Sequence, residues 1–203
     1  MRAVTRKSFV LFIVPSLAAF FPVLSAAEKP AKSADVASVV GELRRLTKAN
    51  MDAFKKGDFP KLIDFVHPSL IQLAGGRDQA IARVQEKFDQ YKSEGTIVEK
   101  AEVSDPTQIL HSQSEKCIYA MVPTKVTLRT ADERIVQSSH LLGLRDDETG
   151  RWSFVELGVT GETIIRLLLP GLPSQLKFPE KQEPVREPIA DKPQTPVTRS
   201  AKP

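Results

Sequence analysis

The chain has 203 residues, with 29 Lys and Arg against 25 Asp and Glu, and a single cysteine. One cysteine excludes an intramolecular disulfide, and no clustered run of Lys and Arg points to a nucleic-acid-binding face. The length fits one domain of ordinary size with terminal extensions.

Residues 1–27 have the pattern of a secretory signal peptide. Two arginines and a lysine precede the apolar run SFVLFIVPSLAAFFPVL, which leads into the small residues SAA. Because two prolines interrupt the run, it predicts cleavage after Ala26 or Ala27 and no stable membrane insertion. Without this leader, 26 basic residues face 25 acidic ones, so the net charge falls from +4 to +1. We expect a periplasmic or secreted protein.

Three helices are expected before the first strand. The first ends at Gly57 and has its apolar residues at helical spacing: Val36, Val39, Leu43, Leu46 and Phe54. Asp58 can cap a short second helix, which Pro68 ends at His67. We interpret His67 as a structural residue whose protonated imidazole would suit the negative end of that helix. After a turn at the double glycine, a third helix runs to Gly95.

A run of strands follows the helices. Segments rich in β-branched and aromatic residues alternate with the turn sequences SDP, TADE and DDETG, which predicts an antiparallel meander. The expected strands cover residues 96–103, 107–113, 116–130, 133–145 and 151–158. Helices followed by strands are typical of the α+β class.

The order of these elements resembles the NTF2-like superfamily, which includes SnoaL-like and ketosteroid-isomerase-like domains. The resemblance covers residues 34–158: a long helix, a short helix ending in FVHPSL, a helix after GGRD, and a meander ending in LLGLRDDETGRWSFVELG. It implies three N-terminal helices packed in the concave face of a curved, mainly antiparallel sheet that forms a cone with an internal pocket. The superfamily contains isomerases, dehydratases, hydrolases and proteins without known catalysis, so the fold alone does not select a function.

The last part of the chain changes in composition. Eight prolines and mixed charges occupy the sequence from Leu169 onward. We expect the domain to cover residues 34–179, with a helical or extended appendage from about residue 160. Residues 180–203 are predicted to form a disordered, solvated tail.

The final hairpin supplies the candidate catalytic residues. If Arg145 pairs with Arg151, antiparallel register places His140 opposite Glu156 on one inward face, where Glu156 could orient the imidazole for acid–base chemistry. Tyr119 could add a hydroxyl group to the same pocket, although a core tyrosine with a local hydrogen bond is the simpler interpretation. A structural ion pair is the alternative for His140 and Glu156, and a slip of one residue would separate them. The expected pocket-lining residues are Leu142, Leu144, Trp152, Phe154 and Met121.

Neither a metal nor a cofactor is expected. His67, His111 and His140 are far apart in the sequence and show no HxH or HExxH spacing. No Gly-x-Ser-x-Gly sequence occurs around a nucleophile. Cys117 lies in the apolar stretch CIYAMV and is interpreted as a small buried side chain.

Three classes of function are compatible with these features. The favoured one is a non-catalytic exported module that binds a small apolar ligand or associates through its sheet face, for example as a homodimer. The second is a cofactor-free isomerase, dehydratase or hydrolase that uses His140, Glu156 and Tyr119. The third is an envelope interaction protein that acts through its Pro-rich tail.

Overall fold

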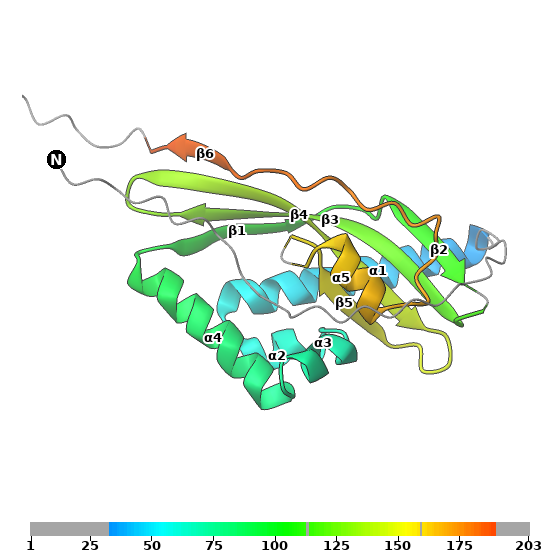
Figure 1. Ribbon diagram of the computed structural model, residues 1–203. Helices are drawn as coiled ribbons and strands as arrows, with labels where there is room; N and C mark the ends of the chain where they lie inside the picture. Colours follow the sequence, from blue (N-terminus) through cyan, green and yellow to red (C-terminus); the bar gives the residue numbers. More distant parts are fainter. Residues whose placement is uncertain (1–32, 113, 159, 190–203) are drawn as a thin grey trace, which may run out of the picture.

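The fold is taken from a computed structural model, which describes residues 33–112, 114–158 and 160–189. The predicted signal peptide and residues 190–203 of the predicted tail lie outside the described residues. The chain is α+β, with helices followed by a six-stranded antiparallel sheet that does not close into a barrel (Figure 1).

Four helices, rather than the expected three, precede the first strand within the described residues. They are α1 (Ser33–Lys56), α2 (Phe59–Asp64), α3 (Pro68–Leu73) and α4 (Arg77–Ser93). The extra helix α3 forms because Pro68, which ends the conformation before it, occupies the first turn of a new helix, where its fixed φ is favourable. Gly57 and Gly95 have left-handed φ angles of 70° and 74°, which confirms them as helix stops.

His67 caps α3 at its N-terminus. Its Nδ1 accepts a hydrogen bond of 3.3 Å from the main-chain N–H of Ser69. The structural role of His67 is therefore confirmed, but the expectation of a protonated ring at a helix C-terminus is wrong. An accepting Nδ1 carries no proton, and burial lowers the pKa of His67, so the neutral ring is the one that stabilises this helix end.

Acidification should destabilise the protein through this cap. Burial lowers the folded-state pKa of both His67 and His140, so the unfolded chain binds protons first as the pH falls. As the pH falls, the free energy of unfolding should begin to decrease near pH 6.5, about the pKa of a histidine in the unfolded chain. It should continue to decrease until the pH is below the pKa values of the two histidines in the folded protein. Urea titrations between pH about 7 and about 5.5 measure this slope.

His67→Asn provides the matched control, because an asparagine oxygen can cap α3 without titrating. In this variant the free energy of unfolding should depend less steeply on pH, because only the contribution of His140 is retained. An unchanged slope would contradict the role of the neutral His67 ring.

The sheet contains all five predicted strands and one more. Its strands are β1 (Ile97–Val103), β2 (Gln108–Ser112), β3 (Cys117–Arg129), β4 (Glu133–Asp146), β5 (Trp152–Glu156) and β6 (Val185–Pro188). β1 and β2 do not pair with each other; both pair with the same edge of β3. The SDP sequence between them is thus an interruption of one edge and not a hairpin turn, since Ser104 and Thr107 both donate main-chain hydrogen bonds to β3.

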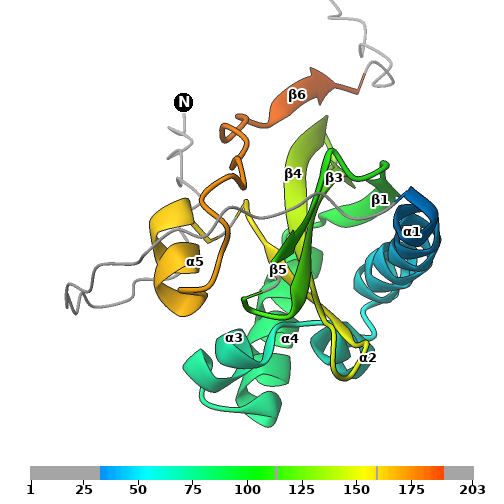
Figure 2. The ribbon, with the colours of Figure 1, turned by 90° about the vertical axis from the view of Figure 1, so that its right-hand side faces the viewer.

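Both faces of the sheet are covered. On one face α1 packs against alternate residues of β3, β4 and β5, and Figure 2 shows α1 on the opposite side of the sheet from α5 (Glu162–Leu168). On the other face α5 and the segment 169–178 pack against the remaining alternate residues. We call these the α1 face and the α5 face. Alternation along each strand places neighbouring residues on different faces.

The outer edges of β5 and β4 are each paired with a short segment. Phe65 and His67 exchange main-chain hydrogen bonds with Phe154, in a parallel bridge along β5. β6 pairs with the start of β4, and Arg186 forms an ion pair with Glu133. Val185–Pro188 of the predicted tail are solvent-exposed, as expected, but they form a strand, because main-chain groups at the edge of the sheet offer hydrogen bonds to an extended chain.

Candidate functional site

The register of the final hairpin differs from the prediction by one residue. Arg145 pairs with Trp152 and Leu141 pairs with Glu156, so His140 is not opposite Glu156. The cause lies in the turn, where Gly150 adopts a left-handed φ of 68° and donates its N–H to the carbonyl of Asp146 at 2.8 Å. A left-handed residue at the end of a hairpin loop shifts the pairing of the strands that follow.

This shift separates the predicted pocket-lining residues. Trp152 and Phe154 lie on the α1 face, whereas Met121, Leu142 and Leu144 lie on the α5 face. All five are at most 6 % exposed and pack within the two apolar clusters. The single apolar pocket that these residues were expected to line is therefore not formed.

Glu156 holds the connection between β5 and α5. Its Oε1 accepts hydrogen bonds from the Ser139 hydroxyl and from the Gly158 N–H, the latter at 2.9 Å. A Cβ added at Gly158 would lie 2.7 Å from Ser139 Oγ and 2.8 Å from Glu156 Oε1, so only glycine leaves room for this arrangement. These contacts give the carboxylate a structural task.

Tyr119 and His140 are not brought together either. Tyr119 is opposite Leu144 and His140 is opposite Pro123, so they are four positions apart along the strands, or roughly 13 Å. The Tyr119 side chain is 4 % exposed, and its hydroxyl donates to the carbonyl of Gly171 at 3.3 Å. The alternative interpretation, a core tyrosine with a local hydrogen bond, is confirmed.

His140 borders an open groove on the α5 side of β4. The groove has a volume of about 210 Å³, and we call it the His140 groove. Burial lowers the pKa of His140, and the nearby charge of Glu156 opposes this effect only in part. The imidazole is therefore largely neutral near pH 7 and can donate or accept hydrogen bonds. The groove is lined by residues 137–140 of β4, by 157, 158 and 160–162, and by 178–182.

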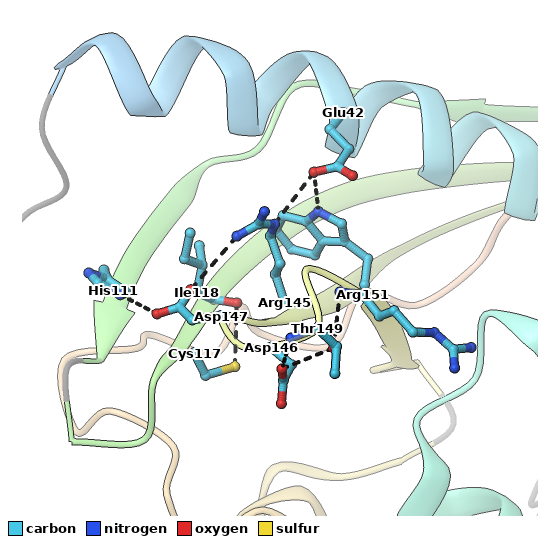
Figure 3. Close-up of polar contacts among 10 residues, drawn as sticks. Glu42, His111, Cys117, Ile118, Arg145, Asp146, Asp147, Thr149 and Arg151 are labelled. Atoms are coloured by element: carbon cyan, nitrogen blue, oxygen red, sulfur yellow. Dashed lines mark hydrogen bonds and ion pairs between the residues drawn. The ribbon is translucent and has the colours of Figure 1, made fainter.

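A second polar cluster lies at the far end of the sheet (Figure 3). His111 Nε2 is 2.6 Å from Asp147 Oδ2, and Arg145 lies between Asp147 and Glu42 of α1. Trp152 Nε1 donates to Glu42 at 3.1 Å. Arg145 Nε is buried 3.5 Å from Glu42 without a hydrogen-bond partner of good geometry among the described residues.

Sequence reasoning missed this cluster because its members come from α1, β2 and the β4–β5 hairpin. The one local signal is the acidic turn after Arg145, in DDETG. The cluster can fix the hairpin to α1 by charge pairing, and its side chains are about one third exposed. Cys117 supplies no nucleophile on the other face, since burial raises the pKa of its thiol to about 11.

Metal binding needs several ligand side chains close together. No group of three or more His, Cys, Asp or Glu residues is arranged to hold a metal ion in the described part of the chain. Within the same residues, no helix has both the length and the apolar content needed to cross a bilayer.

The chain matches no family model, no curated protein and no solved structure.

Proposed function

We propose that this protein is an exported, non-catalytic binding module with the NTF2-like cone fold, and that it holds its ligand in the His140 groove. The observation that carries the proposal is the groove itself, which has room for a small ligand and is bordered by hydroxyl, amide and imidazole groups. Charged side chains and the apolar residues Leu157, Phe178 and Pro179 complete the lining, and ligand sites combine polar groups with apolar surface in this way.

The element order supports the fold. Helices come first, consecutive antiparallel strands follow, and α1 packs against one face of the sheet. In the NTF2-like arrangement the sheet would curve around these helices as a cone. Export is supported by the sequence pattern of residues 1–27.

Binding is favoured over catalysis because the acid–base residues do not converge. His140 and Glu156 belong to opposite faces of the sheet by strand alternation, and Glu156 is occupied by Ser139 and Gly158. A general base must reach the proton that it removes, and it needs a partner in the correct orientation. The predicted pair of His140 and Glu156 therefore does not supply this arrangement.

Filling the groove should weaken ligand binding. Gly161 lines the groove, and a Cβ added there meets no atom within 4 Å, so Gly161→Phe can be introduced without a clash at that carbon. We expect fragment hits detected in ¹H–¹⁵N spectra to shift the amide signals of Ser138, His140 and Gly158. Their affinity should fall by at least about tenfold in Gly161→Phe, because the ring occupies the ligand volume.

Gly161→Ala is the matched control and should bind as the unmodified protein does. If the fragments shift signals only outside the groove, or bind Gly161→Phe with unchanged affinity, the groove is not the ligand site.

A further inference from the structure

One wall of the His140 groove is an extended segment held at both of its ends. Residues 178–182 line the groove and belong to no helix or strand. Before this wall, the main chain of Lys177 exchanges hydrogen bonds of 2.7 and 2.9 Å with the Gln108 side chain. After it, the chain continues into β6, which pairs with β4 (Figure 1). The position of the wall therefore depends on these two attachments.

The two attachments differ in how much apolar surface they bury. Three leucines of the segment 169–176 are buried in the apolar cluster of the α5 face, and Phe178 packs against the same cluster. In contrast, residues 180–188 contain no buried residue, and only Pro184 among them is half-buried. The first attachment is therefore stabilised by the core, whereas β6 depends on main-chain hydrogen bonds and exposed charges.

The charges that hold β6 are weak. Arg186 forms an ion pair with Glu133, and their side chains are 57 % and 31 % exposed. Exposed ion pairs contribute little free energy, and salt screens them. Segments with few buried contacts are the ones that open locally while the rest of the protein stays folded. We therefore expect β6 to separate from β4 without unfolding of the domain.

The groove is small for a ligand site when β6 is paired. Its volume is about 210 Å³, whereas ligand sites usually enclose about 300–1,000 Å³. The floor, residues 137–140 of β4, is fixed by its pairing with β3. The Leu157 N–H donates to the His140 carbonyl at 2.9 Å, which fixes the start of the other wall. Residues 178–182 therefore form the wall with the weakest attachment.

We propose that residues 179–188 are a lid on the His140 groove and that β6 is the latch of this lid. Release of β6 from β4 moves residues 179–182 away and admits a ligand larger than the closed groove holds. Renewed pairing of β6 then retains that ligand. This inference rests on the proposed function, because it describes how access to the same site is controlled.

The test places a thiol on the floor of the groove, in the variant Ser138→Cys. Ser138 lines the groove and is half-buried. The bulky reagent pyrene-maleimide should reach this thiol only when the lid is open, whereas the small reagent N-methylmaleimide fits into the closed groove. Both reagents are neutral and react in the same way, so the ratio of their rates reports access alone. The background from Cys117 is low, because burial raises the pKa of its thiol to about 11.

Arg186→Glu, introduced together with Ser138→Cys, should open the latch, since it replaces the ion pair with Glu133 by like-charge repulsion. The rate with pyrene-maleimide should rise at least about threefold relative to the rate with N-methylmaleimide. Arg186→Lys is the matched control, because it keeps the charge and should leave the ratio unchanged. Equal ratios in the Glu and Lys variants would overturn the proposal.

Hydrogen exchange of the protein without substitutions gives a second readout. The paired amides of β6 should exchange with solvent much faster than the amides of β3 that pair with β4, because the latch opens without global unfolding. Equal protection of β6 and β3 would overturn the proposal. Should Ser138→Cys fail to fold, this comparison decides the question.

Neither measurement needs a ligand, so the lid and the proposed function can fail separately. If fragments bind in the groove while the ratio of maleimide rates does not respond to Arg186→Glu, the lid fails and the proposed function stands. If the ratio responds but no fragment binds, the proposed function fails and the motion of residues 179–188 stands. If neither result is obtained, both fail.

Discussion

Trp152→Ala should lower the free energy of unfolding by about 3–5 kcal/mol, the usual cost of removing a large aromatic side chain from a core. Trp152 is 6 % exposed and stacks on Phe154 with ring centroids 6.3 Å apart. Its Nε1 also donates to Glu42, so the substitution leaves a carboxylate beside Arg145 without one of its partners. Because Trp152 is the only tryptophan, unfolding must be followed by circular dichroism.

Trp152→Phe separates the two contributions. It keeps an aromatic ring on the α1 face but removes the hydrogen bond to Glu42, which should cost about 1–3 kcal/mol for a bond to a charged group. A loss below about 1 kcal/mol in Trp152→Ala would mean that this aromatic pair is not part of the core.

Gly143→Ala should destabilise the protein by about 1–3 kcal/mol through overpacking. Gly143 is opposite Phe154 in the sheet, and a Cβ there would lie 3.0 Å from the Trp152 ring and 3.1 Å from the Phe154 ring. Both rings are held between the sheet and α1, so neither can move away freely. Chemical denaturation measures the change in the free energy of unfolding.

Gly41→Ala is the matched control, because it adds the same methyl group at an exposed position of α1. A Cβ at Gly41 meets no atom within 4 Å, and alanine favours a helix interior by about 1 kcal/mol. The two substitutions should therefore have opposite signs. A stabilising Gly143→Ala would show that the rings have more room than the structure gives them.

The register of one hairpin accounts for most of the difference between the predicted and the observed site. The sequence predicted both strands, and it identified the acidic turn between them. It placed Gly150 in a five-residue turn, whereas in the structure Asp146 already pairs with Arg151, and this shift of one residue exchanges the faces of a strand. As a result, the proposed partnership of His140 with Glu156 and the five-residue apolar pocket were both lost.

The charged cluster and the His140 groove lay beyond sequence reasoning for another reason. His111 and Asp147 are 36 residues apart, and the sheet alone places them 2.6 Å from each other. The place of the His140 groove depends likewise on where β5 ends and where β6 begins. No local pattern in the chain encodes such positions.

The sequence by itself determined most of the helices and strands, because their signals come from neighbouring residues. Apolar periodicity, glycine stops and β-branched runs defined α1, α4 and the strands β1 to β5, because these signals act over neighbouring residues. Only the tertiary structure decided which residues share a face, which segments pair at the edges of the sheet and how His67 caps α3. These features depend on register and on contacts between distant segments, whose free energies are set by packing and main-chain hydrogen bonds across the whole sheet.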